Sequence, residues 1–337
     1  MRPAPDHHFV MSRLKAIDSA YRETPLTEAS DLAATLGVSQ LYLKDEGQRP
    51  LGSFKALGGT FAGLEAIAAR GSAARLLVCA SDGNHGLAVA TAARHAGLPA
   101  QIFLPSDIAK ERVRRILARG GEVVIVPGTF DDAVDAAARA AQVDGAILIA
   151  DTSDNVDDMV TGDVMAGYGV IAGELRDQFA AASMARPTHL FIQAGVGGLA
   201  AAMARGLHGW MAEPAEIVVV EPEAAACVQL ALRLGHPETV PGDLRTCASM
   251  LSCGKASAPA LQILQHCGAK GITVSEEQLT AAPALLADAG APATTPSGGA
   301  GFAGLVHALQ DPALRTALRL TPDSRVLIVI SEGPANT

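Results

Sequence analysis

The stretch RLLVCASDGNHGLAVATAARHAG, residues 75–97, decides the fold that this sequence predicts. It begins with an apolar run of strand length, continues through a polar loop that contains two glycines, and ends in an alanine-rich segment with helical periodicity. An apolar run without polar alternation is typical of a strand buried on both faces of a parallel sheet. Residues 75–97 therefore predict a strand, a loop and a helix in that order.

The same order of strand and helix recurs on both sides of this stretch. Further apolar runs, each followed by a helical segment, begin at residues 100, 122 and 146, and a second series starts near residue 187. We expect the apolar segment LYLKDE, residues 41–46, to join the second series, so that the chain crosses between two lobes twice. The predicted fold class is α/β, with open, twisted parallel sheets flanked by helices. A ligand is expected in the cleft between the lobes.

Composition and charge restrict the classes of function. The formal net charge is -9 and the basic residues are scattered, so we expect neither nucleic acid nor an anionic membrane as a partner. The opening segment MRPAPDHHFVMSRLK lacks an apolar core of signal-peptide length, and no run approaches the roughly 18 apolar residues of a membrane span. A cytoplasmic protein is therefore expected. The five cysteines include no Cys-x-x-Cys pair, so neither a disulfide framework nor a metal site is predicted.

The segment GSFKALGG, residues 52–59, contains the first chemically informative residue, Lys55. It lies between Gly-Ser-Phe and a predicted helix, a position in which a lysine can be desolvated. Desolvation lowers the pKa of a lysine and favours Schiff-base formation with an aldehyde. A single lysine is more often a solvated surface charge, so this interpretation depends on the motifs that follow.

The loop ASDGNHG, residues 80–86, is the second motif, placed after a predicted strand and before a predicted helix. Its free backbone N–H groups and the positive end of the helix would form a site for a substrate carboxylate. Asn84 could donate a hydrogen bond to a ring oxygen, and Asp82 could carry protons. Alternatively, Asp82 only caps the helix and Asn84 only makes the turn. The substrate-binding candidates are Ser81, Asp82, Gly83 and His85.

Two further motifs follow late strands. In QAGVGGLAAAM, residues 193–203, three glycines would let backbone amides approach a phosphate at the start of a helix. The order Gly-x-Gly-Gly does not match a dinucleotide fingerprint or a P-loop. In IVISEG, residues 328–333, Ser331 could hydrogen-bond the nitrogen of a heteroaromatic ring. Each motif could also be only a structural turn.

In this order, the four motifs resemble those of fold-type II pyridoxal 5'-phosphate (PLP) enzymes, the tryptophan synthase β family. The resemblance extends from about Tyr21 to about Gly333. It implies a larger PLP-binding domain of residues 1–50 and 161–337, a smaller substrate-side domain of residues 51–160, and a homodimer. Among the groups of this family, FKALGG, SDGNHG and the SCG segment at residues 252–254 are most similar to the diaminopropionate ammonia-lyases.

The resemblance also implies a role for each candidate residue. Lys55 would hold PLP as a Schiff base, and Lys55, Asp82 and Asp151 would transfer protons. The remaining cofactor contacts would come from Phe54 on the ring, Asn84 on its phenolic oxygen, Gly195, Val196, Gly197 and Gly198 on the phosphate, and Ser331 on the ring nitrogen. The implied reaction is α,β-elimination of a small β-substituted amino acid to a 2-keto acid and ammonia.

Two segments depart from the ammonia-lyase pattern. Residues 255–257 and 295–298 lack acidic residues that those enzymes usually have, and a β-ammonium group should favour nearby carboxylates. The sequence therefore leaves open a dehydratase of a β-hydroxy amino acid such as serine, threonine, 3-hydroxyaspartate or phenylserine.

Overall fold

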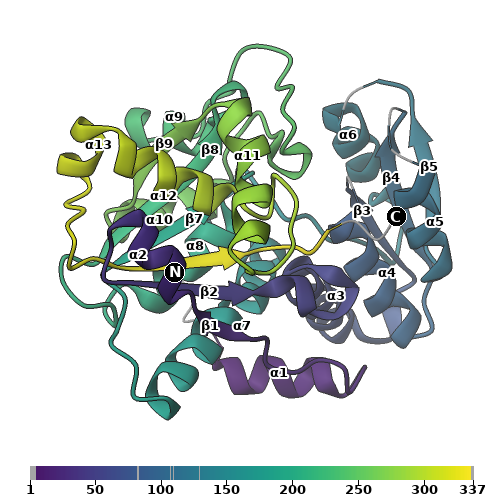
Figure 1. The fold of residues 1–337 in the computed structure, drawn as a ribbon. Coiled ribbons are helices and arrows are strands. Elements are labelled where there is room, and N and C mark those ends of the chain that lie inside the picture. The colour runs from purple at the N-terminus through teal and green to yellow at the C-terminus, as the bar shows by residue number, and fades with distance from the viewer. Residues whose placement is uncertain (1–4, 82, 107, 109, 129, 335–337) are drawn as a thin grey trace.

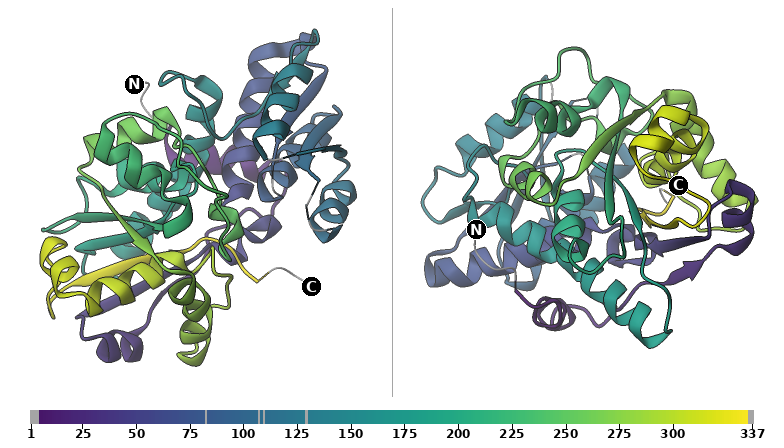
Figure 2. Two further views of the ribbon diagram at one scale, coloured as in Figure 1. Left: turned by 90° about the horizontal axis from the view of Figure 1, so that it is seen from above. Right: turned by 90° about the vertical axis from the view of Figure 1, so that its left-hand side faces the viewer.

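The computed structural model describes residues 5–81, 83–106, 108, 110–128 and 130–334, arranged as two lobes side by side (Figure 1). Each lobe is built around a sheet, and both sheets have helices on their two faces (Figure 2). The sheet of the larger lobe has the strand order β1 (Leu26–Glu28), β2 (Gln40–Asp45), β10 (Arg325–Ile330), β7 (His189–Gln193), β8 (Glu216–Pro222) and β9 (Lys270–Val274). The sheet of the smaller lobe has the order β5 (Glu122–Val126), β4 (Ala100–Pro105), β3 (Leu76–Ala80) and β6 (Ala146–Leu148).

The predicted α/β class with parallel sheets is confirmed. Strand β2 pairs in parallel with β10, with Tyr42 opposite Leu327, so the segment LYLKDE does join the second series. The short edge strand β1 differs, because it runs antiparallel to β2. An antiparallel edge strand on an otherwise parallel sheet is common, since antiparallel neighbours do not need the long crossover connection that parallel neighbours require.

The helices divide between the lobes as the strands do. The smaller lobe contains α3 (Lys55–Arg70), α4 (Asn84–His95), α5 (Lys110–Ala118) and α6 (Phe130–Ala140). The others are α1 (His7–Lys15), α2 (Ser30–Leu36), α7 (Met159–Ala181), α8 (Gly198–Leu207), α9 (Cys227–Leu234), α10 (Ala258–His266), α11 (Glu276–Asp288), α12 (Ala300–Gln310) and α13 (Pro312–Ala317). In the part of the chain that the structure describes, no helix combines the length and the apolar character needed to cross a membrane.

Helix α7 joins the two lobes, because it packs against both α3 and α8. Its crossing with α3 is close: a Cβ on Gly167 would lie 2.6 Å from the Cα of Gly58. Only glycine allows two helix backbones to approach this closely, so we infer that these two residues fix the distance between α3 and α7. Lys55 is the first residue of α3, and its position therefore depends on this contact.

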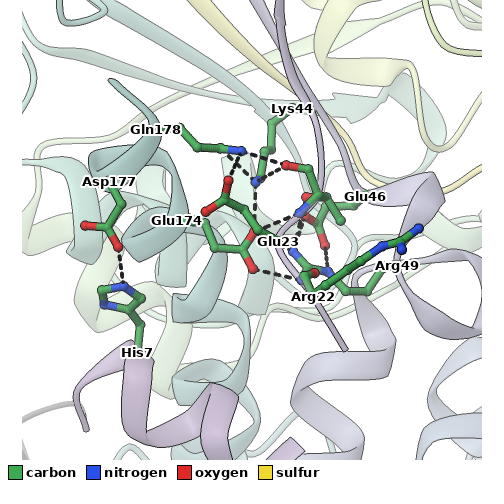
Figure 3. Close-up of polar contacts among 10 residues, drawn as sticks. His7, Arg22, Glu23, Lys44, Glu46, Arg49, Glu174, Asp177 and Gln178 are labelled. Carbon is green, nitrogen blue, oxygen red and sulfur yellow. Dashed lines mark hydrogen bonds and ion pairs between the residues drawn. The ribbon is translucent and has the colours of Figure 1, made fainter. Parts of the chain in front are cut away.

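A buried group of charged side chains fixes the segment that leads to Lys55 (Figure 3). Glu174 of α7 accepts hydrogen bonds from Lys44 Nζ at 2.8 Å and from both terminal nitrogens of Arg49 at 2.9 and 2.8 Å. Arg49 also donates to Glu46 at 2.8 and 2.7 Å. We refer to Lys44, Glu46, Arg49 and Glu174 as the buried ion network. Its two positive and two negative charges balance, which is the condition under which buried charges are tolerated.

Candidate active site

The site is a cavity of about 940 Å³ between the two lobes, beyond the carboxyl ends of β3, β7 and β10. This is where ligands bind in open α/β sheets. The cavity brings together residues from all four predicted motifs. The predicted site residues that line it are Phe54, Lys55, Ser81, Gly83, Asn84, His85, Asp151, Gly195, Val196, Gly197, Gly198 and Ser331. Asp82 lies outside the described residues.

Lys55 and Asp151 form an ion pair in this cavity. Their side chains are only 24% and 18% exposed. Burial by itself lowers the pKa of Lys55, but the charge of Asp151 outweighs it and holds that pKa above its ordinary value. Burial by itself raises the pKa of Asp151, but the charge of Lys55 holds it below its usual range. The proton therefore stays on the Lys55 ammonium, beside the ionised carboxylate of Asp151.

Two aromatic rings stand beside this ion pair. Phe54 and Tyr168 meet edge to face with their centroids 4.8 Å apart, and Lys55 Nζ lies 5.6 Å from the first ring and 6.0 Å from the second. The buried hydroxyl of Tyr168 has no hydrogen-bond partner among the described residues. Tyr168 was not predicted. The signal for it is a single polar aromatic between two glycines in the Ala/Gly-rich helix α7.

The glycine loop and Ser331 face the same cavity. Gly197 has a φ of 99°, in the left-handed region that favours glycine, and a Cβ on Gly195 would lie 2.9 Å from Cys253 Sγ. Helix α8 begins at Gly198 with no side-chain cap, so its first N–H groups are available for an anion. Ser331 Oγ accepts a hydrogen bond from Gln193 Nε2 at 2.7 Å, which leaves its own hydrogen available to donate.

The loop before α4 is held by its own side chains. Ser81 Oγ accepts from the backbone N–H groups of Gly83 and Gly86 at 2.9 and 2.8 Å. His85 Nε2 donates to the carbonyl oxygen of Ile149 at 2.8 Å. Burial lowers the pKa of His85, so we expect the ring to be neutral. Ser81 and His85 thus line the cavity, and their hydrogen bonds shape the loop.

Glu332 is a second carboxylate in the cavity that was not predicted as a site residue. Its Oε2 accepts from Asn84 Nδ2 at 2.9 Å, and its Oε1 accepts from Thr295 Oγ1 at 2.6 Å. Burial raises the pKa of this carboxyl above its ordinary value. The sequence signal for Glu332 is an acidic residue two positions after a buried apolar strand.

The comparisons with known proteins agree with this geometry. The family model described as "Pyridoxal-phosphate dependent enzyme" matches residues 17–332, and the chain belongs to this family. Diaminopropionate ammonia-lyase from Escherichia coli (strain K12) is 31% identical over 94% of this chain and 85% of its own length. The human protein "Serine dehydratase-like" is 32% identical over 85% of this chain and 82% of its own length. A crystal structure of holo diaminopropionate ammonia lyase from Escherichia coli superposes with a TM-score of 0.86, at 27% identity, over 98% of this chain and 89% of that chain.

The residues of the cavity fit PLP, the cofactor of this family. Lys55 offers an amine for the aldehyde, the glycine loop offers backbone donors for the phosphate, and Ser331 offers a hydroxyl for the ring nitrogen. Beside Lys55, the unpartnered hydroxyl of Tyr168 is a buried polar atom that a bound ligand would satisfy. When bound, PLP supplies an electron sink that acidifies the Cα–H bond of an amino acid. The protein is a PLP-dependent lyase.

Proposed function

We propose that this enzyme catalyses α,β-elimination of a β-substituted amino acid to a 2-keto acid and ammonia, with 2,3-diaminopropionate as the principal substrate. The observation that carries the proposal is the ion pair between Lys55 and Asp151 in a cavity that also contains the glycine loop. An elimination needs one group that removes the Cα proton and another that protonates the leaving group. Lys55 and Asp151 form such a pair.

Each predicted site residue has a role in this proposal. Lys55 attaches the cofactor and exchanges the Cα proton, and Asp151 protonates the leaving group. Asp82 would serve the opposite face of the substrate, as the resemblance implies. Phe54 and Asn84 orient the cofactor ring, residues 195–198 bind its phosphate, and Ser331 contacts its nitrogen. The backbone N–H groups of Asn84 and His85 bind the substrate carboxylate, because those of Ser81 and Gly83 are bonded within the protein, and the ring of His85 holds the loop in place.

Glu332 supports a diamino substrate. Residues 255–257 and 295–298 contain no acidic residue, but Glu332, two residues after β10, offers the cavity a carboxylate. Thr295 is itself in one of those segments, and its hydroxyl holds Glu332 in place. A buried carboxylate such as that of Glu332 is a favourable partner for a β-ammonium group.

A keto-acid release assay on PLP-loaded protein tests the proposal. Both enantiomers of 2,3-diaminopropionate would be compared with serine, threonine, 3-hydroxyaspartate and phenylserine. We expect kcat/KM for 2,3-diaminopropionate to exceed that for each hydroxy amino acid by at least about tenfold, or roughly 1.4 kcal/mol of differential transition-state binding. A preference for a hydroxy amino acid would instead identify a dehydratase, the alternative that the human serine dehydratase-like relative favours. No turnover of any of these would reject the elimination activity.

The Lys55–Asp151 pair should also control how fast the protein takes up its cofactor. Covalent attachment requires the neutral amine of Lys55, and Asp151 keeps that amine protonated. We expect Asp151→Asn to lower the pKa of Lys55 and to speed PLP uptake at neutral pH by about tenfold for each pKa unit. Absorbance after stopped-flow mixing of cofactor-free protein with PLP, between pH 6 and 9, measures this rate.

The pH profile gives the sign of the effect. In the unaltered protein the uptake rate should rise with pH across the whole range, because the pKa of Lys55 lies above it. In Asp151→Asn the rate should level off at a lower pH. Asp154→Asn is the matched control, since Asp154 pairs with Lys255 at the surface at 2.7 Å. Identical profiles for Asp151→Asn and the unaltered protein would show that Asp151 does not hold the proton on Lys55.

We also propose a cytoplasmic homodimer with domains of residues 1–50 plus 161–337 and 51–160. The resemblance to fold-type II enzymes supports the dimer and the two domains. Light scattering on the eluting protein should give twice the chain mass of 34.4 kDa. A mass equal to that of one chain would reject the dimer.

A further inference from the structure

A second cavity, of about 1190 Å³, opens next to the first at the mouth of the cleft between the lobes. The two cavities have five lining residues in common: Gly83, Asn84, Met250, Ser297 and Glu332. We call the second one the outer cavity. A group attached to the β-carbon of a substrate in the inner cavity could extend into it, and the roles proposed so far give it no function.

Arginines dominate the charge of the outer cavity. Among the described residues that line it, the charged side chains are Arg112, Arg115 and Arg119, with Glu332 as the single carboxylate. Helix α5 places Arg112 and Arg115 three residues apart, and Arg119 directly follows its last residue, Ala118. Spacings of three, four and seven residues put side chains on one helix face, so the three guanidinium groups line the same wall.

The arginines are connected to the substrate loop and to the opposite lobe. A Cβ on Gly83 would lie 3.3 Å from Arg112 Cδ, so Arg112 packs directly over the loop that precedes α4. Its Nη2 donates to Ser249 Oγ of the larger lobe at 3.0 Å. Arg115 donates through Nη2 to the carbonyl oxygen of Leu51 at 2.8 Å. An arginine has five N–H donors in a planar group, so one such bond leaves donors of Arg115 for a ligand.

Three guanidinium groups around one cavity attract anions, and planar guanidinium groups suit the paired oxygens of carboxylate and phosphate. Glu332 is the only acidic residue among the described residues of this lining, and its two oxygens accept hydrogen bonds from Asn84 and Thr295. The described lining of the outer cavity therefore has more positive than negative charge. Glu332 lies at the boundary with the inner cavity, so a short β-ammonium group would meet its carboxylate, whereas a longer anionic substituent would reach the arginines.

We propose that the outer cavity binds the anionic end of a β-substituent, and that the enzyme has a further elimination activity on amino acids such as O-phosphoserine. This activity rests on the elimination chemistry of the proposed function. The Cα–H and Cβ–O bonds break, the proton passes to a base of the site, and phosphate leaves with the electron pair of the Cβ–O bond. Water then hydrolyses the resulting enamine to pyruvate and ammonium.

The test compares O-phosphoserine with serine, which differs only in lacking the phosphate. We expect the PLP-loaded enzyme to release phosphate and pyruvate from O-phosphoserine with a higher kcat/KM than it shows for serine. The double variant Arg112→Gln/Arg119→Gln should lower kcat/KM for O-phosphoserine by on the order of 10- to 100-fold and change that for serine by less than about threefold. Arg114→Gln is the matched control. Arg114 is on the same helix and pairs with Glu111 at 3.4 Å, but it does not line the cavity.

A binding measurement separates this proposal from the proposed function. Titration calorimetry of inorganic phosphate into PLP-loaded protein reports on the outer cavity, because the cofactor's own phosphate occupies the glycine loop. We expect phosphate to bind to the unaltered protein and to Arg114→Gln, and about tenfold more weakly to the double variant. If the enzyme turned over 2,3-diaminopropionate but neither bound phosphate nor turned over O-phosphoserine, this inference would be wrong and the proposed function would stand. Phosphate binding that is unchanged in the double variant would overturn it as well.

Discussion

Lys55→Ala is expected to abolish covalent attachment of PLP and to lower kcat/KM for elimination by on the order of 10³-fold or more. Lys55 is the only lysine among the described residues that line the cavity, so the substitution removes the amine that the cofactor needs. It also leaves the carboxylate of Asp151 without its cation. Two functions are lost together, since Lys55 both attaches the cofactor and exchanges a proton. Borohydride reduction followed by peptide mass spectrometry locates the attachment, and keto-acid release measures the activity.

The control for this experiment is Lys270→Ala. Lys270 also pairs with a carboxylate, that of Glu216 at 2.9 Å, but it does not line either cavity. We expect this variant to keep both the attached cofactor and its activity. If Lys55→Ala retained a covalently bound cofactor, another lysine would have to be the attachment site, and the role of Lys55 would be wrong.

The sequence predicted the buried strands and also β5 and β6, the edge strands of the smaller sheet, but it missed β1 and β9, the edge strands of the larger sheet. Strand β3, LLVCA, is a continuous apolar run and β7, HLFIQ, has an apolar centre because helices cover both sides of each sheet, and such runs stand out in the sequence. Strand β9, KGITV, is an edge strand that starts with an exposed lysine followed by a glycine, so it lacks this pattern. Strand β1 has three residues, all at least partly exposed, and its position depends on pairing with β2 rather than on its own composition.

The candidate site was predictable where backbone geometry dictates residue type. The glycine loop and the loop before α4 carry that signal, because glycines, small polar residues and a following helix are required together. Tyr168 and Glu332 carry no comparable signal, since a tyrosine in a helix or a glutamate after a strand is ordinarily exposed or structural. Their place in the cavity depends on how the lobes pack, and above all on the approach of α7 to α3 at Gly167.

That packing depends on the buried ion network, and Glu174→Gln should destabilise the protein severely. The substitution removes the negative charge and one acceptor oxygen of Glu174. This side chain is 6% exposed and forms ion pairs with Lys44 and Arg49. The variant leaves two buried cations with only Glu46. Breaking a buried ion pair in this way costs about 3–5 kcal/mol in the free energy of unfolding, a large part of the 5–15 kcal/mol that is typical of a folded domain. Calorimetry should show a melting temperature lower by on the order of 10 °C.

A surface pair on the same helix provides the control. Asp177→Asn breaks a bond of 3.0 Å to His7, but Asp177 is 52% exposed, so the expected loss is below about 1 kcal/mol (Figure 3). The double variant Lys44→Met/Glu174→Gln restores the charge balance between Arg49 and Glu46, and it should recover part of the lost stability. Equal melting temperatures for Glu174→Gln and Asp177→Asn would show that the network does not stabilise the fold.

The pKa of Glu174 gives the network a pH dependence. Burial alone raises this pKa, but the hydrogen bonds and charge of Arg49, with the charge of Lys44, lower it below its value in the unfolded chain. The unfolded state therefore binds more protons, and the contribution of Glu174 is fully present above the unfolded pKa. It is lost as the pH falls through the lower, folded pKa. The stability difference between the unaltered protein and Glu174→Gln should accordingly shrink with acidification, which melting curves between pH 3 and 7 would measure. A difference that stayed constant over this range would mean that the cost of the substitution comes from replacing an acceptor oxygen by an NH₂ donor and not from the lost charge.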